Sequence, residues 1–260
     1  MANSSASQRL ESLDILRGFD IFMLVFFQPL FTRIVSSAHL PVPEWFMNQF
    51  NHVDWEGFAA WDLIMPLFLF MAGVAMPFSL SKYRNSPNKK PLYLRIVRRV
   101  IGLFILGAVV QGNLLAFDAS TLRLYSNTLQ AIASGYLITA IILLNTGFKG
   151  QVIAGGVLFA VYWAVFTFGG DFSPEGNVAE KIDQLVLGKF RDGVYWDESG
   201  WHFADWYRYT WIISSIGFGL TVLSGALAGE ILRNKPKRGA PMPKNKRAAV
   251  LCITGVCLVL

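Results

Sequence analysis

The 260-residue chain is 53% hydrophobic and 14% aromatic, while only 15% of its residues are charged. A soluble domain normally carries about a quarter charged residues, so this composition argues against a soluble domain and favours a polytopic membrane protein. The net charge of +6 and the pI of 9.4 are better explained by membrane topology than by nucleic-acid binding.

Six apolar segments are long enough to cross a hydrocarbon core, which takes roughly 17 to 25 residues. They cover residues 13–36, 58–81, 96–116, 126–146, 152–168 and 209–232. A seventh segment begins at Ala248 and is too short to span. We therefore predict an all-α, polytopic integral membrane helix bundle with six full transmembrane helices and the start of a seventh. Residues 1–260 are expected to form one transmembrane domain that is incomplete at its C-terminus.

The basic residues predict the orientation, because Lys and Arg near helix ends stay on the cytoplasmic side. With the N-terminus inside, 17 Lys and Arg residues fall inside and 6 outside. The N-terminal sequence lacks the features of a cleaved signal peptide. We expect an integral protein of a bacterial cytoplasmic membrane with its N-terminus inside. Cys252 and Cys257 lie in the last segment, where we expect neither a disulfide nor a metal site.

The first apolar segment carries polar residues that hydrocarbon would exclude. At about 100° per residue, Asp14, Arg17, Asp20 and Gln28 fall on one stripe of a helix. Ionisable groups at membrane depth tend to pair or to line a site. The stripe is compatible with a polar cavity. It is equally compatible with an Asp14–Arg17 ion pair in a first helical turn that still lies at the membrane interface.

The second apolar segment contains Asp62, which shares a stripe with Pro66, Leu69 and Gly73. Pro66 has no amide hydrogen to bond the carbonyl group of Asp62 four residues earlier. A carboxylate and a free carbonyl are tolerated in a membrane where protein or a water-filled cavity satisfies them. Asp62 is therefore a candidate site residue, with a structural hydrogen bond to a neighbouring helix as the alternative.

His52 precedes this segment and is flanked by Asp54 and Glu56. A loop histidine is most often a solvated surface residue. The spacing nevertheless places His52 over the mouth of the cavity that Asp62 would line, and a histidine beside a carboxylate is a common general-base pair.

The long loop before the last full span is unusually aromatic. Eight of the seventeen residues from Tyr195 to Trp211 are Phe, Trp or Tyr. Such rings form belts at membrane interfaces, and they also offer flat faces on which a sugar acceptor can stack. The sequence leaves both interpretations open.

Two motifs stand out in the chain. The first motif comprises Arg9, Ser12, Asp14, Arg17 and Gly18, and the second comprises His52, Trp55, Gly57, Asp62 and Pro66. Both resemble motifs of transmembrane acetyltransferases related to heparan-alpha-glucosaminide N-acetyltransferase. Further similarity lies at Leu129, Gln130, Ile132 and Ala133 and in the helix ending LSGALAGEIL. The resemblance covers most of residues 9–232. The family tends to carry asparagine where this chain has Gln28.

The resemblance implies that cytoplasmic acetyl-CoA donates an acetyl group to a saccharide on the other face, with His52 at the active centre and Asp62 as the matching helix acid. The expected catalytic residues are His52, Asp62 and Gln28. The expected cofactor-binding residues are Arg95, Arg98, Arg99 and Gln130. The three arginines are also explained as basic residues that anchor the helix end on the cytoplasmic side of the membrane. The expected substrate-binding residues are Asn51, Trp55, Asp14 and Arg17.

Direct transfer and a covalent intermediate on His52 are both compatible with these residues. A secondary transporter, with Asp14, Arg17 and Asp62 as an ion or proton relay, is the main alternative, although no inverted repeat is evident. A membrane scaffold without catalytic function would leave Asp62 unexplained. Acetyl-CoA, a saccharide acceptor and the lipid bilayer are the expected partners, nucleic acid is not, and a homo-oligomer is left open.

Overall fold

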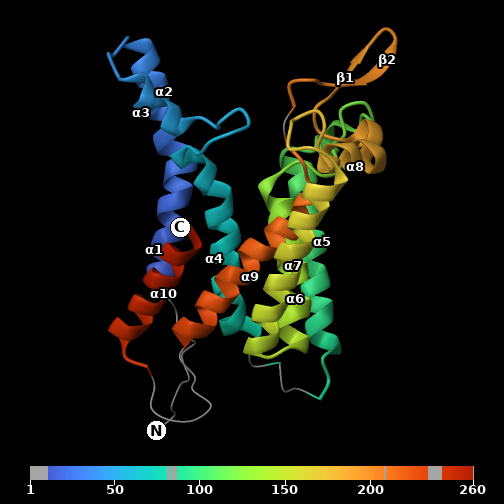
Figure 1. Ribbon diagram of the computed structural model, residues 1–260. Coiled ribbons are helices and arrows are strands. Elements are labelled where there is room, and N and C mark those ends of the chain that lie inside the picture. Colours follow the sequence, from blue (N-terminus) through green and yellow to red (C-terminus); the bar gives the residue numbers. More distant parts are fainter. Residues whose placement is uncertain (1–10, 81–82, 84–86, 208, 234–241, 260) are drawn as a thin grey trace.

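The computed structural model describes residues 11–80, 83, 87–207, 209–233 and 242–259. It is a bundle of helices with one short hairpin, which confirms the predicted all-α membrane architecture (Figure 1). Within the described residues, five segments are long and apolar enough to cross a membrane: Glu11–Ser37, Ala60–Leu80, Thr128–Asn145, Phe148–Gly169 and Ser214–Arg233. These correspond to five of the six spans predicted from sequence.

The remaining predicted span, the third in chain order, differs from the observed helix α5 in its bounds, and α5 carries more basic residues than the other spans. It was expected at 96–116, whereas α5 runs from Lys90 to Val110. The helix includes Arg95, Arg98 and Arg99, so its apolar stretch is shorter than in the other spans. Beyond it, Asn113 has a left-handed backbone, and the chain continues into a 3-10 turn at Leu114–Ala116. An α-helix cannot pass through a left-handed residue, which explains the earlier end.

The first span is an α-helix interrupted by a wider turn. α1 (Glu11–Phe22) leads into a π-helical segment, η1 (Met23–Phe27), and then into α2 (Gln28–Ser37). A π-helical turn adds a residue to the helix and rotates everything after it, and such turns often occur at functional sites. Gln28 therefore does not keep the angular position that a regular 100° count gives it.

The chain then passes through α3 (Glu44–Met47) and η2 (Asn48–Phe50) to η3 (Ala60–Leu63) and α4 (Ile64–Leu80). After α5 come α6 (Thr128–Asn145) and α7 (Phe148–Gly169). The side chain of Asn127 caps α6 by accepting hydrogen bonds from the amides of Leu129 and Gln130.

The connection after α7 is folded rather than extended. It contains α8 (Val178–Leu187), η6 (Gly188–Phe190) and the antiparallel hairpin β1 (Val194–Asp197) and β2 (Gly200–Phe203). α9 (Ser214–Arg233) and α10 (Lys244–Val259) follow. The hairpin and α8 lie at the top of Figure 1, together with α2, and α5 begins at the bottom. We call the top of the bundle in this view the hairpin end and the bottom the basic end.

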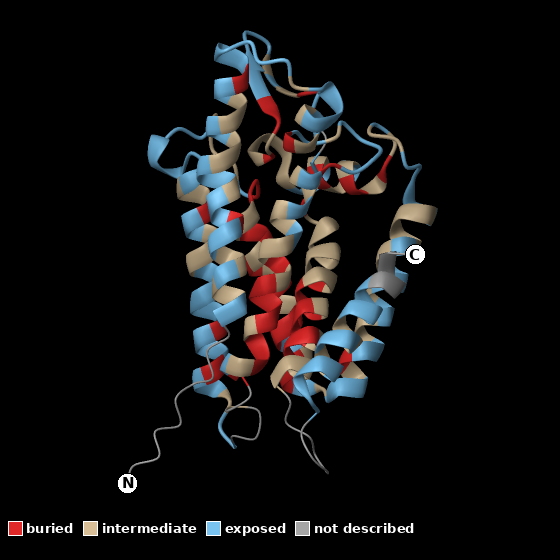
Figure 2. Cartoon of the chain, turned by 90° about the vertical axis from the view of Figure 1, so that its left-hand side faces the viewer, coloured by how far each residue is buried: buried red, intermediate tan, exposed pale blue. Residues whose placement is uncertain are grey.

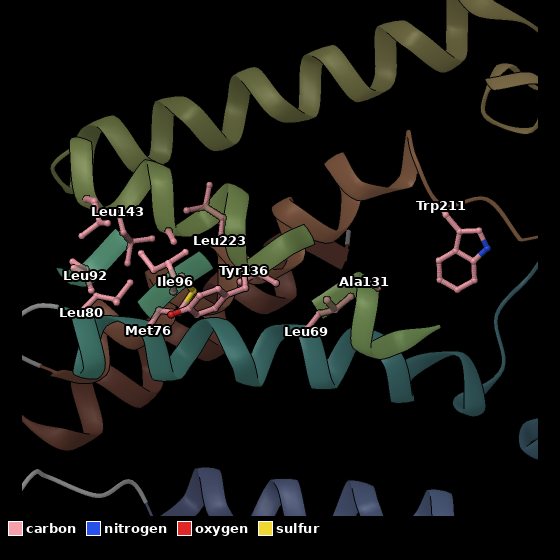
Figure 3. Close-up of a cluster of buried hydrophobic side chains, with 14 of the residues drawn as sticks. Leu69, Met76, Leu80, Leu92, Ile96, Ala131, Tyr136, Leu143, Trp211 and Leu223 are labelled. Carbon is pink, nitrogen blue, oxygen red and sulfur yellow. The ribbon is translucent and has the colours of Figure 1, made fainter. Parts of the chain in front are cut away.

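α9 is the central helix and packs closely on α4. A side-chain carbon at Gly73 would overlap the carbonyl oxygen of Val222, and one at Gly225 would overlap that of Phe70. Small residues at such crossings let two membrane helices approach closely. Figure 3 shows Leu69 and Met76 of α4 in the same cluster as Tyr136 and Leu223. The buried residues gather in the middle of the bundle (Figure 2).

We expect Gly73→Ala to lower the melting temperature of the purified protein in detergent. The new methyl group would meet the α9 backbone, and overpacking of this kind costs about 1–3 kcal/mol or more. Gly102→Ala is the matched control, because a side-chain carbon there meets nothing within 4 Å. A Gly73→Ala variant as stable as Gly102→Ala would contradict the close α4–α9 contact.

Candidate functional site

His52 and Asp62 form a hydrogen-bonded pair at the hairpin end of α4. The Nδ1 atom of His52 lies 2.7 Å from Oδ1 of Asp62. A carboxylate only accepts, so Nδ1 carries the proton in this bond. In the neutral imidazole that tautomer leaves Nε2 as an acceptor. The pair is partly exposed, with 51% of the His52 side chain and 24% of the Asp62 side chain accessible.

Asp62 lies in η3 just before α4, at the edge of the apolar run rather than within a long helix. Its Oδ2 accepts a hydrogen bond from the amide of Ala59 at 2.9 Å, and its own amide donates to the carbonyl oxygen of Ala59 at 3.0 Å. Pro66 falls in the first turn of α4, where a missing amide hydrogen is tolerated. The break that the sequence predicted inside a helix is therefore the start of a helix. Both Asp62 oxygens are engaged, which fixes the carboxylate toward His52.

A cavity opens at the hairpin end above this pair. It has a volume of about 600 Å³, and we call it the loop cavity. Its lining comes from the loop before η3 and from the loop before α9: Asn51, His52, Val53, Asp54, Trp55, Trp206, Tyr207 and Tyr209. Aromatic faces and carboxylate or amide groups therefore surround the exposed side of His52, as in sites that bind polar ligands with flat apolar faces.

Two further cavities reach His52 from within the bundle. The α7–α9 cavity, of about 380 Å³, is lined by His52, Asp62, Met65, Pro66, Leu69, Tyr162, Tyr209, Ser214, Gly217, Phe218 and Thr221. The α5–α6 cavity, of about 490 Å³, is lined by His52, Leu24, Trp61, Ile64, Met65, Phe68, Val110, Gln111, Asn127, Thr128, Leu129 and Ile132. His52 is thus shared by these three cavities, and it also lines a further pocket of about 640 Å³ in its own loop.

Three other predicted site residues lie near His52. Nε2 of Gln28 donates to the carbonyl oxygen of Phe50 at 3.2 Å, and Nδ2 of Asn51 donates to that of Met47 at 3.4 Å. Both bonds fix the turn that carries His52. Nε1 of Trp55 donates to the carbonyl oxygen of Phe172 at 2.8 Å and ties this loop to the loop after α7.

The polar residues of α1 lie deeper than His52. Nη2 of Arg17 donates to the carbonyl oxygen of Met71 at 3.3 Å. Met71 is nine residues along from Asp62, or roughly 13 Å at 1.5 Å per helical residue. Asp20 is 1% exposed, and its carboxylate oxygens have no hydrogen-bond partner among the described residues. The structure therefore does not bring Arg17 to His52, and Asp14, one turn earlier, is further away still.

The predicted cofactor residues divide into two groups. Arg95, Arg98 and Arg99 are exposed at the basic end of α5, where Arg95 donates to the hydroxyl group of Tyr83 at 3.0 Å and Arg99 lies over the ring of Tyr136 at 4.4 Å. A basic, exposed group of this kind is accessible to an anionic ligand.

Gln130 is fully buried, and none of these arginines is among its hydrogen-bond partners. Its amide accepts from Ser126 and Asn127 and donates to the carbonyl oxygens of Phe104 and Leu124. These four bonds use the hydrogen-bonding capacity of the amide and join α5 to α6. A contact between Gln130 and CoA would have to replace one of them.

The aromatic loop divides into parts with different surroundings. Tyr207 and Trp211 are buried and hydrogen-bonded to each other, with the indole nitrogen 2.9 Å from the hydroxyl oxygen. Trp206 and Tyr209 face the loop cavity, and the ring of Tyr209 meets His52 edge to face at 6.2 Å. Tyr195, Trp196 and Trp201 are exposed on the hairpin. Sequence reasoning noted the aromatic spacing but could not separate these roles.

Sequence reasoning missed the buried charges that hold this loop. Arg191 is fully buried, pairs with Glu180 and lies 4.6 Å from the ring centre of Tyr207. Asp183 accepts hydrogen bonds from the amides of Trp211 and Ile212 just before α9. Burial raises the pKa of Asp183, while the two amide donors act in the opposite direction. The connection between α7 and α9 is therefore a folded cap at the hairpin end of the bundle.

Among the residues that the structure describes, no group of three or more His, Cys, Asp and Glu side chains could hold a metal ion. Residues 9–173 match a family model described as heparan-alpha-glucosaminide N-acetyltransferase, catalytic. This range contains the His52–Asp62 pair, the first span and all of α4 to α7, while Arg9 of the first motif lies outside the described residues. A comparison with curated proteins found no match.

Proposed function

The chain belongs to the heparan-alpha-glucosaminide N-acetyltransferase family, and from this premise we propose that it transfers acetyl from cytoplasmic acetyl-CoA to a saccharide amine or hydroxyl group on the opposite face of the membrane. The His52–Asp62 hydrogen bond is the observation that carries the proposal. It leaves an imidazole nitrogen available as a base at the meeting point of three cavities.

The proposed reaction needs a single base. The acceptor attacks the carbonyl carbon of the thioester, and Nε2 of His52 takes the proton from its amine or hydroxyl group. A new C–N or C–O bond forms, the C–S bond breaks, and the proton held by His52 passes to the thiolate of CoA. Asp62 stabilises the imidazolium that forms in between. Gln28 and Asn51 each have a second N–H group that could stabilise the oxyanion.

The charge distribution supports a donor that enters from the basic end. The phosphates of CoA would be held by Arg95, Arg98 and Arg99, while the acetyl end reaches His52 through the bundle. The loop cavity, with Trp55, Trp206 and Tyr209, suits a saccharide, because pyranose rings stack on aromatic faces. Asp14 and Arg17 lie along the bundle and are proposed to act on the donor side.

Acetyl transfer by the purified protein tests this proposal. The protein in detergent is incubated with acetyl-CoA and glucosamine, and both released CoA and N-acetylglucosamine are measured. We expect both products in equal amounts. Release of neither product with glucosamine or with a panel of neutral sugars would contradict the acetyltransferase function, and acetyl-CoA-independent ion flux in vesicles would favour a transporter.

The proposed orientation, with the N-terminus inside a bacterial cytoplasmic membrane, gives a second expectation. In a Cys252→Ser, Cys257→Ser background, a membrane-impermeant thiol reagent added outside should label Ser199→Cys on the hairpin and leave Asn88→Cys unlabelled until the cells are opened. The 17-to-6 distribution of basic residues is the reason. Labelling of both positions from outside would contradict transfer across the membrane.

A further inference from the structure

Tyr209 occupies a position between two of the cavities. Of the described residues, only His52 and Tyr209 line both the loop cavity and the α7–α9 cavity. Their rings meet edge to face, with centroids 6.2 Å apart and an interplanar angle of 80°. Among the described residues, the boundary between the two spaces therefore consists of the catalytic candidate and one aromatic ring.

Tyr207 and Trp211, two residues before and two residues after Tyr209, are both anchored. Tyr207 donates from its hydroxyl group to Oδ2 of Asp192 at 2.9 Å, and its ring meets that of Tyr209 at 5.5 Å. On the other side the amide of Trp211 is bonded to Asp183 at 2.6 Å. Tyr209 itself is half exposed. Tyr209 is therefore held between two anchored residues, with its ring on the lining that the loop cavity and the α7–α9 cavity share.

We propose that Tyr209 is a specificity-determining residue that shields the acetyl group from water and so favours transfer over hydrolysis. The inference rests on the proposed acetyltransferase function and extends it. With the thioester in the α7–α9 cavity, the Tyr209 ring and His52 separate it from the loop cavity, which opens at the hairpin end. A saccharide that stacks on the aromatic lining presents its nucleophile over His52, whereas bulk water is excluded.

The competing reaction uses the same base. In hydrolysis a water oxygen attacks the thioester carbon, His52 takes one water proton, the C–O bond forms and the C–S bond breaks. The products are acetate and CoA, with the proton returned to the thiolate. Because only the nucleophile differs, a residue that controls water access changes the ratio of acetate to acetylated acceptor without changing the base.

The test measures this ratio in Tyr209→Ala. With acetyl-CoA and glucosamine present, we expect the ratio of acetate to N-acetylglucosamine to rise about tenfold, equivalent to the 1.36 kcal/mol that separates tenfold rates. Tyr209→Phe keeps the ring and should keep the ratio of the unmodified protein. Tyr195→Ala, an exposed tyrosine on the hairpin, is the matched control and should also keep it.

An unchanged ratio in Tyr209→Ala, or an equal rise in Tyr209→Phe, would overturn the inference while leaving the acetyltransferase proposal intact. If the unmodified protein consumes no acetyl-CoA, the proposed function and this inference fall together.

A second measurement does not depend on turnover. Thr221 lines the α7–α9 cavity, so Thr221→Cys in the Cys252→Ser, Cys257→Ser background reports water access to it. A small charged thiosulfonate added from outside should react about tenfold faster when Tyr209→Ala is also present. Equal reaction rates with and without the Tyr209→Ala substitution would show that the ring does not close the cavity, and would overturn the inference even if the alanine variant were inactive.

Discussion

His52→Ala will lower acetyl transfer by a factor of roughly 10² to 10⁴, the usual contribution of general-base catalysis. Acetyl-CoA binding should persist, because the proposed nucleotide contacts lie at the basic end of α5. The protein should also remain folded, since His52 is half exposed and Asp62 keeps its bond to the amide of Ala59. Initial rates, donor binding by calorimetry and melting temperature are measured on the same preparation.

The chain offers a matched control for this substitution. His202 also lies at the hairpin end and also pairs with an aspartate, with its Nε2 atom 3.2 Å from Oδ1 of Asp197. It lines neither the loop cavity nor the two cavities within the bundle. His202→Ala should transfer acetyl at close to the normal rate. A His52→Ala variant that behaves like His202→Ala would remove the catalytic role of His52 without deciding the fold or the family.

Asp62→Asn should lower transfer by about 10²- to 10⁴-fold while donor binding and melting temperature change little. The amide of Ala59 donates to Oδ2, so the single oxygen of the asparagine is retained there and its NH₂ group faces His52. Nδ1 must then accept, and the imidazole proton moves to Nε2. The base would be in the wrong tautomer to take a proton from the acceptor.

The same substitution in the second pair, Asp197→Asn, serves as the control and should leave the transfer rate unchanged. Rates are normalised to folded protein, because a structural aspartate would reveal itself by early melting. An Asp62→Asn variant that melts early but works normally when folded would support the structural interpretation of Asp62. An Asp62→Asn variant with nearly normal activity and normal stability would contradict both the catalytic and the structural role of Asp62.

Some of the site was accessible from sequence because its signals are local. The spacing of His52 and Asp62, ten residues apart around a helix start, placed them together, and the structure shows a 2.7 Å hydrogen bond. The same reasoning put Pro66 inside the helix, because hydropathy does not distinguish a 3-10 turn from the α-helix that follows it. It also expected Gln28 on the α1 stripe, and the π-helical turn at Met23–Phe27 changes that register.

Other features depend on contacts between distant segments. Tyr209 is 157 residues from His52, and their ring contact depends on the folded cap that Arg191 and Asp183 hold in place. The close approach of α4 and α9 likewise depends on Gly73 and Gly225. Gly225 and Gly229 have the four-residue spacing typical of close helix contacts, but this spacing does not identify α4 as the partner helix. No local pattern identifies the partner of a small residue, because packing depends on shape complementarity between two surfaces.

The sequence by itself determined the membrane class, the approximate positions of the spans and the His52–Asp62 pair. The class and the spans follow from the cost of placing polar groups in hydrocarbon, which acts over a few turns of one chain segment. The pair follows from the short spacing of the two residues around a helix start. Only the tertiary structure decided which aromatic residues face His52, which polar residues are deep in the bundle and how the cavities meet. Those properties arise where elements far apart in the chain pack together, so their physical cause lies in the contacts between helices and loops.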